Sequence, residues 1–194
     1  MTDVITLINA KDYKALAQYC EFEEIQSASG SNIMLGQLYP VYLASCILLN
    51  DLQSARHVRK RILASNNKTP EIDAIWSVAT ALIQKSYPQV YQNLDSFQWS
   101  EYMVPLVQQI KADIREQMLI MIPNVYTSIE LKQVRDYFGT SEEECLQELS
   151  TRGWRFNETT RVLFPVKPAP KPRISTNSNQ FEKLSDIVLS LEKF

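Results

Sequence analysis

The stretch from Thr127 to Trp154, TSIELKQVRDYFGTSEEECLQELSTRGW, constrains the fold more than any other part of the chain. Apolar residues recur at helical spacing on both sides of Gly139, and a glycine there suits the left-handed residue that ends a helix. Two Ser/Thr-x-x-Glu patterns, beginning at Thr127 and Ser141, predict capping boxes at two helix starts, with Ser128 as a competing first cap. The segment therefore predicts two short helices joined by a tight turn.

Two short apolar runs follow this pair of helices. The residues WRF and RVLFP flank the polar turn NETT, which predicts two antiparallel strands within 154–165. The order helix, helix, strand, turn, strand is that of a winged helix. Such a module either binds DNA through its second helix or binds other proteins.

Charge distinguishes these two functions. The second helix carries four carboxylates, on Glu142, Glu143, Glu144 and Glu148. Arg152, Arg155 and Arg161 are too few to offset them, and the whole chain has a net charge of −2. Because phosphate contacts through basic side chains supply most non-specific DNA affinity, we expect no direct binding to nucleic acid. A winged-helix nucleic-acid regulator remains the alternative from a different class.

The first 125 residues predict successive helices, and only 4 glycines occur in the whole chain. The segments 32–50 and 52–65 resemble one tetratricopeptide-like hairpin. Thr69 and Pro70 predict a capped helix start. We expect Pro123 to end or kink the long helix that precedes the winged helix. The apolar stripe of that long helix comprises Met103, Val107, Ile110, Ile114, Met118 and Met121.

The sequence offers little material for catalysis or for metal binding. Cys20, Cys46 and Cys145 lie far apart, and His57 is the only histidine. No zinc-ligand spacing and no glycine-rich phosphate loop occur, so we predict no catalytic, cofactor-binding or metal-binding residues. Without a long apolar run or a signal peptide, we expect an intracellular protein with no membrane contact. The basic run within 56–61 is either a solvated face or a contact for an acidic neighbour.

A proline-rich linker at 166–178 precedes a final helix at 179–194. Its apolar side chains would cover roughly 140° of the helix circumference. Burying six such side chains contributes roughly 9–18 kcal/mol before opposing terms, so we expect the stripe to pack against something. It either folds back on its own domain or joins a bundle of helices from other chains. The stripe comprises Phe181, Leu184, Ile187, Val188, Leu191 and Phe194.

Several motifs together resemble a known family. The segments NDLQSARHVRKRI, IWSV, FQWSE, YTSIELKQVRDYFG and GWRFNETTRVLFP are similar to the family of small PCI-domain proteins that includes subunit 8 of the COP9 signalosome. The related small PCI subunits of the proteasome lid and of translation initiation factor three are the alternative identities within the same family. The likeness runs from about Leu35 to Pro165 and resumes in the C-terminal helix.

The resemblance implies a mainly α fold with a defined organisation. A right-handed, tetratricopeptide-like helical array (1–125) would lead into a winged helix (126–165), and the two together form a PCI domain. The linker (166–178) and the final helix (179–194) would follow. In this family, winged helices associate through strand edges and C-terminal helices gather into a bundle. Carried onto this chain, the six stripe residues form the bundle helix, and the candidate strand edge comprises Arg161, Val162, Leu163 and Phe164.

The resemblance also implies a role without catalysis. The signalosome removes Nedd8 from the cullins of cullin-RING ubiquitin ligases at a zinc site in another subunit, whose His and Asp ligands this chain lacks. The function that the resemblance implies is that of a non-catalytic scaffold subunit of the hetero-oligomeric signalosome, in the cytoplasm and nucleus. The expected partners are the other PCI and MPN subunits of the complex, with no nucleic acid, membrane or cofactor.

Overall fold

The structure is a computed structural model that describes all residues except 1, 29–34, 66, 168–177 and 192–194. The described chain is mainly helical, as predicted, with a small three-stranded sheet. The first seven helices are α1 (Thr2–Asn9), α2 (Tyr13–Ala28), α3 (Leu35–Leu48), α4 (Leu52–Ala64), α5 (Pro70–Ile83), α6 (Tyr87–Ser96) and α7 (Val104–Val125).

Helix α3 lies at the centre of the helical array. It packs against α2 and α4 on either side and against α5 and α7, so every residue from Leu38 to Ile47 is buried. This burial on all sides explains why the α3 segment is largely apolar, without an amphipathic stripe. Pro40 lies inside α3, and the helix continues past it to Leu48.

The helix starts follow local capping chemistry. The Thr69 side chain accepts a hydrogen bond from the Ile72 N–H (3.3 Å), and Pro70 is the first residue of α5, as predicted. Asp51 caps α4 in the same way, because its carboxylate accepts a hydrogen bond from the Ser54 N–H (3.0 Å).

Helix α7 runs beyond Pro123, the residue at which we expected it to end or kink. Pro123 lies within the helix, which continues to Val125, and the Tyr126 N–H donates to the Ile122 carbonyl (2.8 Å). The prediction that the helix ends at Pro123 is wrong. A proline within two residues of a helix end removes only one hydrogen bond, so the last turn persists.

The winged helix follows α7 directly. Its elements are β1 (Ile129–Glu130), α8 (Leu131–Phe138), α9 (Glu142–Thr151), β2 (Arg155–Asn157) and β3 (Val162–Phe164). The strand order is β1-β3-β2, and both pairs are antiparallel. Helix α10 (Ser178–Leu191) lies near the C-terminus.

Only one of the two predicted capping boxes forms. At the start of α9, Ser141 and Glu144 exchange side-chain to backbone hydrogen bonds, both at 3.4 Å. The box predicted from Thr127 to Glu130 is wrong, because Glu130 pairs with β3 in an extended conformation and the helix begins one residue later. Gly139 ends α8 with φ 59°, as predicted.

Two hydrophobic cores share α7. Ile110 and Ile114 belong to the core of the helical array, whereas Met118 and Ile122 belong to the core of the winged helix. The winged-helix core also contains Val134, Phe138, Cys145, Leu149, Trp154 and Leu163.

Hydrogen bonds join the helical array to the end of α8. The hydroxyl of Tyr91 on α6 donates to the Tyr137 carbonyl (3.0 Å), and Nε of Arg115 on α7 donates to the Phe138 carbonyl (3.0 Å). These donors satisfy carbonyls in the last turn of α8, which have no partner within the helix itself.

Candidate protein-interaction surfaces

The strand predicted as the sheet edge is the central strand. β3 pairs with β1 through Leu163 opposite Ile129, and with β2 through Leu163 opposite Phe156. Leu163 is buried, and the Arg161 carbonyl accepts a hydrogen bond from the Leu131 N–H (3.0 Å). The prediction that Arg161, Val162, Leu163 and Phe164 form the edge of the sheet is therefore wrong. Both sides of a central strand already carry hydrogen bonds.

The free edges of the sheet are β1 and β2. β2 is the longer edge, and Arg155 and Asn157 on it are exposed while Phe156 is half-buried. On the outer face of the sheet, Phe164 of β3 lies beside Arg155 and is 43% exposed. The sequence alone missed β2 as an edge. The winged-helix order, in which the first strand pairs with the last, was the signal that could have identified it.

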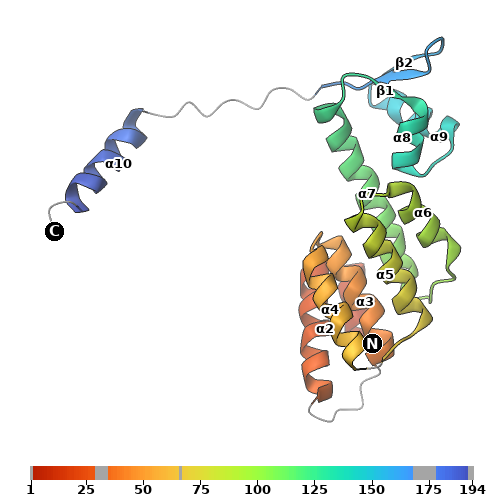
Figure 1. Cartoon of the computed structure of the whole chain (residues 1–194), viewed down its shortest axis with the longest axis vertical. Coiled ribbons are helices and arrows are strands. Elements are labelled where there is room, and N and C mark those ends of the chain that lie inside the picture. The colour runs from red at the N-terminus through yellow and green to blue at the C-terminus, as the bar shows by residue number, and fades with distance from the viewer. Residues whose placement is uncertain (1, 29–34, 66, 168–177, 192–194) are drawn as a thin grey trace.

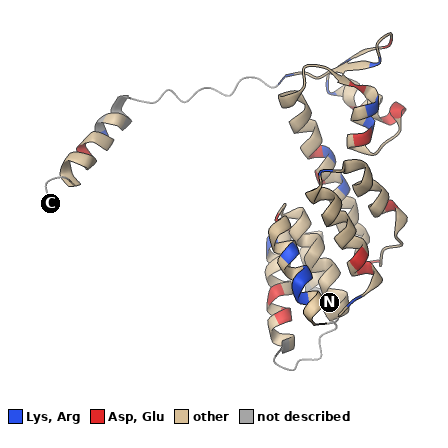
Figure 2. Cartoon of the chain, viewed as in Figure 1, with Lys and Arg blue, Asp and Glu red and all other residues tan. Residues whose placement is uncertain are grey.

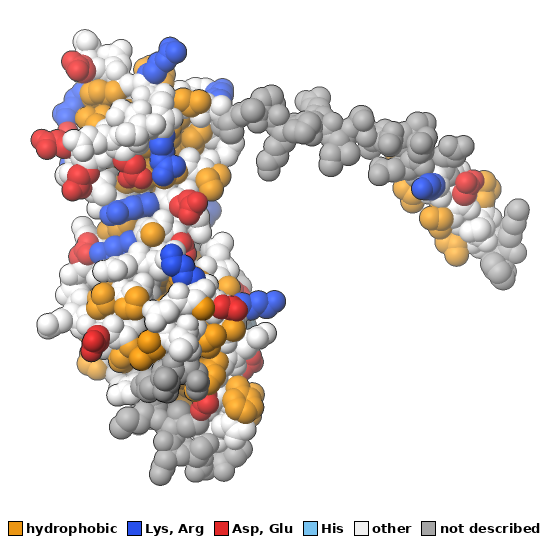
Figure 3. Space-filling model, turned by 180° about the vertical axis from the view of Figure 1, so that it is seen from behind, with side chains coloured by type: hydrophobic (Ala, Val, Ile, Leu, Met, Phe, Trp, Pro, Cys, Tyr) orange, Lys and Arg blue, Asp and Glu red, His pale blue; other side chains and the backbone are white. Residues whose placement is uncertain are grey.

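Helix α10 exposes its apolar stripe. Five of the six predicted stripe residues are described, and their side chains are between 49% and 69% exposed. Figure 3 shows these hydrophobic side chains uncovered on the helix. Phe194 lies outside the described residues, and so does most of the predicted linker. Leu189 is also exposed, on the otherwise polar side of the helix, and was not predicted. The helix has the amphipathic surface that a helical bundle requires.

The acidic helix α9 pairs with the few basic residues near it. Arg161 Nη2 lies 2.5 Å from Glu142 Oε2, and Arg135 Nη1 lies 3.8 Å from Glu142 Oε1. Arg152 pairs with Glu148 at 3.6 Å. Figure 2 shows acidic and basic residues interspersed over α8 and α9. This surface lacks the extended basic face that binding to a nucleic-acid backbone needs.

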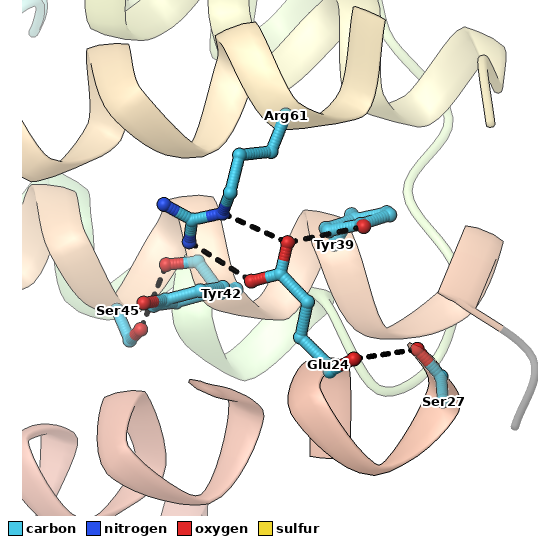
Figure 4. Close-up of polar contacts among 6 residues, drawn as sticks. All are labelled: Glu24, Ser27, Tyr39, Tyr42, Ser45 and Arg61. Carbon is cyan, nitrogen blue, oxygen red and sulfur yellow. Dashed lines mark hydrogen bonds and ion pairs between the residues drawn. The ribbon is translucent and has the colours of Figure 1, made fainter. Parts of the chain in front are cut away.

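The basic run on α4 is partly used inside the chain. Arg61 donates from Nε and Nη2 to both carboxylate oxygens of Glu24 on α2, each at 2.9 Å, and the Tyr39 hydroxyl donates to the same carboxylate at 3.2 Å (Figure 4). The Arg61 guanidinium also lies over the ring of Tyr42. The Glu24 carboxylate raises the pKa of Arg61 further above its ordinary value. This bidentate pair joins α2, α3 and α4.

The remaining basic residues of α4 divide into two groups. Arg59 pairs with Asp73 on α5 at 2.6 Å and lies over the ring of Trp76. Arg56, His57 and Lys60 are exposed. The solvated face that we considered for this run is therefore narrower than the sequence suggested.

The three thiols are buried, unpaired cysteines. Burial raises the pKa of Cys20 and of Cys46 to about 12 and that of Cys145 to about 11. Neutral buried thiols are poor nucleophiles. Among the described residues, no three acidic, cysteine or histidine side chains could together hold a metal ion, and no helix is long and apolar enough to cross a membrane.

Comparison with known proteins confirms the resemblance. The chain is 31% identical to COP9 signalosome complex subunit 8 of Danio rerio over 97% of this chain and 98% of that protein. The proteins of the same name from Xenopus tropicalis and Dictyostelium discoideum are 30% and 29% identical, over 95% and 99% of this chain and 95% and 97% of theirs. The family model described as CSN8/PSMD8/EIF3K matches residues 34–173. This chain therefore belongs to the CSN8/PSMD8/EIF3K family.

Proposed function

We propose that this chain is a non-catalytic assembly subunit of the COP9 signalosome, the complex that removes Nedd8 from cullins. The observation that carries the proposal is the nearly end-to-end similarity to proteins named as subunit 8 of that complex. A match that includes the C-terminal helix supports a shared mode of assembly, beyond a shared domain. On this proposal the chain acts by binding other PCI and MPN subunits in the cytoplasm and nucleus.

Helix α10 is the proposed bundle element. Its exposed stripe would be buried between helices of partner subunits. A helix of 14 residues is marginally stable by itself in water, so contact with partners would also stabilise its helical conformation. Gain of helix stability and burial of the stripe would then occur together on assembly.

The β2 edge is the proposed second contact. A free strand edge offers backbone N–H and C=O groups to a partner strand, and this kind of pairing extends a sheet across a subunit boundary. The proposal assigns this contact to Arg155–Asn157 in place of the central strand β3.

The test is purification of the tagged full-length chain from cells, followed by mass spectrometry of the proteins that copurify. The expected result is the set of signalosome subunits. Recovery of proteasome-lid or initiation-factor subunits in their place would contradict the proposal. So would recovery of the chain by itself.

A pair of charge-matched variants tests the role of α10. Leu184→Asp with Val188→Asp places two carboxylates on the apolar stripe and should reduce copurification of the partner subunits at least tenfold. Ser185→Asp with Ser190→Asp adds the same charge outside the stripe and should have little effect. Equal recovery of partners with both variants would exclude α10 from the assembly contact.

A further inference from the structure

A second polar surface lies beside β1, on the side of the sheet away from β2. It is a cleft of about 380 Å³ between α8 and the turn that joins β2 to β3. Three cationic side chains line it, on Lys132, Arg135 and Arg161, together with the carboxylates of Glu130 and Glu142. We call this surface the cationic cleft. Its residues come from three separate segments of the winged helix, and the lining charges sum to an excess of one positive charge.

The carboxylate of Glu142 does not occupy all the N–H donors of Arg135 and Arg161. Arg161 approaches it at 2.5 Å, but Arg135 remains at 3.8 Å and lies 3.5 Å from Asp136. Each guanidinium has five N–H donors, so several remain available for another oxygen acceptor. Lys132 is exposed and makes no ion pair within the described part of the chain.

The backbone at Arg161 supports a role for its side chain. Its φ is 52°, in the left-handed region, where glycine fits without cost and other residues cost about 1–2 kcal/mol. Its carbonyl accepts the Leu131 N–H, a bond that any residue at this position could make. The ion pair with Glu142 is exposed, and exposed pairs contribute little to stability. The fold therefore gains little from an arginine here.

We propose that the cationic cleft binds one anionic side chain of a partner protein, either a carboxylate or a phosphorylated hydroxyl group. Both present oxygen atoms to which Lys132, Arg135 and Arg161 can donate together. The exposed carboxylates of Glu143 and Glu144 on α9 disfavour a polyanion such as nucleic acid. The site is separate from the β2 edge and from α10. The proposal for the cleft therefore does not depend on which complex contains the chain.

Nuclear magnetic resonance of the ¹⁵N-labelled full-length chain tests the site. Three five-residue peptides are titrated, identical except for a central phosphoserine, glutamate or glutamine. The amide signals of Lys132 and Thr160 should move with either or both of the anionic peptides and stay in place with the glutamine peptide. The anionic peptide that shifts these signals identifies whether the ligand is a carboxylate or a phosphorylated hydroxyl group. A single-stranded oligonucleotide that moves these signals at lower concentration than both peptides would overturn the proposal, as would no response to either anionic peptide.

Variants separate binding from folding. Arg161→Gly removes the backbone cost, so the melting temperature should stay the same or rise while the dissociation constant of the anionic peptide increases at least tenfold. Lys132→Gln should weaken binding in the same direction. Lys60→Gln, an exposed lysine on α4, is the matched control and should leave the dissociation constant within twofold. Unchanged affinity in Arg161→Gly, or an equal loss in Lys60→Gln, would overturn the assignment.

Discussion

The two cores of the molecule differ in how far each depends on the other. The core of the helical array is built from seven helices, and fully buried side chains such as Leu43 and Ile75 lie on α3 and α5. The winged-helix core takes Met118 and Ile122 from α7, its other buried residues lie within 129–163, and Tyr87 of α6 packs against it. The difference indicates that the array can be stable without the winged helix, whereas the winged helix requires the end of α7.

This dependence bears on the predicted boundary between residues 125 and 126. That boundary remains a prediction. A fragment that begins at residue 126 would lack Met118 and Ile122, so its core would lose two fully or nearly fully buried side chains. A fragment that includes the whole of α7 retains both.

Truncating a buried residue of α7 should show most clearly whether the two cores unfold independently. Ile122→Ala should lower the stability of the winged helix by about 2–5 kcal/mol, because it leaves a cavity in the smaller core. The stability of α3 should change much less. Hydrogen exchange measured by mass spectrometry reports both regions in one experiment.

Ile120→Ala is the control on the same helix, because Ile120 is 63% exposed, and it should change stability by less than about 0.5 kcal/mol. Equal loss of protection in α3 and in α8 of the Ile122→Ala variant would mean that both cores unfold as one unit.

Gly139 allows a second comparison, between two left-handed glycines. Gly139→Ala should destabilise the protein by about 2–4 kcal/mol, because a Cβ there would overlap the ring of Tyr91 in addition to the backbone cost. Gly153→Ala should cost only about 1–2 kcal/mol, since its Cβ would lie 3.6 Å from Val166. Urea unfolding of both variants measures the difference. Equal destabilisation would show that the Tyr91 ring on α6 can move away from residue 139 with no loss of stability.

The buried thiols predict a smaller effect of pH on both cores. Burial raises the pKa of Cys20 and Cys46 to about 12 and of Cys145 to about 11, above the ordinary value of 9.0. A raised pKa means that the folded state holds the proton more tightly than the unfolded state. The associated stability is complete below pH 9 and is lost as the pH rises through the folded values.

The free energy of unfolding should therefore fall between pH 9 and 11, and it should fall less steeply in Cys20→Ala and in Cys145→Ala. The comparison uses the slope with pH, because each substitution also changes stability at neutral pH. If both variants showed the same change of unfolding free energy with pH as the unchanged chain, the raised pKa values of the thiols would be contradicted.

Local sequence signals predicted helix starts well where capping by nearby residues alone determines the start. Ser141 with Glu144, and Thr69 with Pro70, form the predicted helix starts because capping depends on residues three apart. Thr127 with Glu130 carries the same signal but fails, because pairing with β3, more than 30 residues away, holds Glu130 extended. A pattern within four residues contains no information about such a distant strand.

The candidate sites were predictable to different degrees. Helical periodicity alone identified the stripe on α10, and its described residues are exposed. The sheet edge required the order of the strands, which depends on how the first strand returns to the last. The cationic cleft required three segments to meet in space, so Lys132, Arg135 and Arg161 gave no signal as a group.

Because α7 is one continuous helix, it sets the orientation of the winged helix relative to the helical array as well as joining their two cores. Successive residues of a helix are rotated by about 100°, so one residue inserted between Ile114 and Met118 would turn the winged helix by about that angle relative to the helical array. Four inserted residues would nearly restore the direction and move the winged helix about 6 Å further away. The number of residues in α7 therefore determines which way the β2 edge and the cationic cleft face.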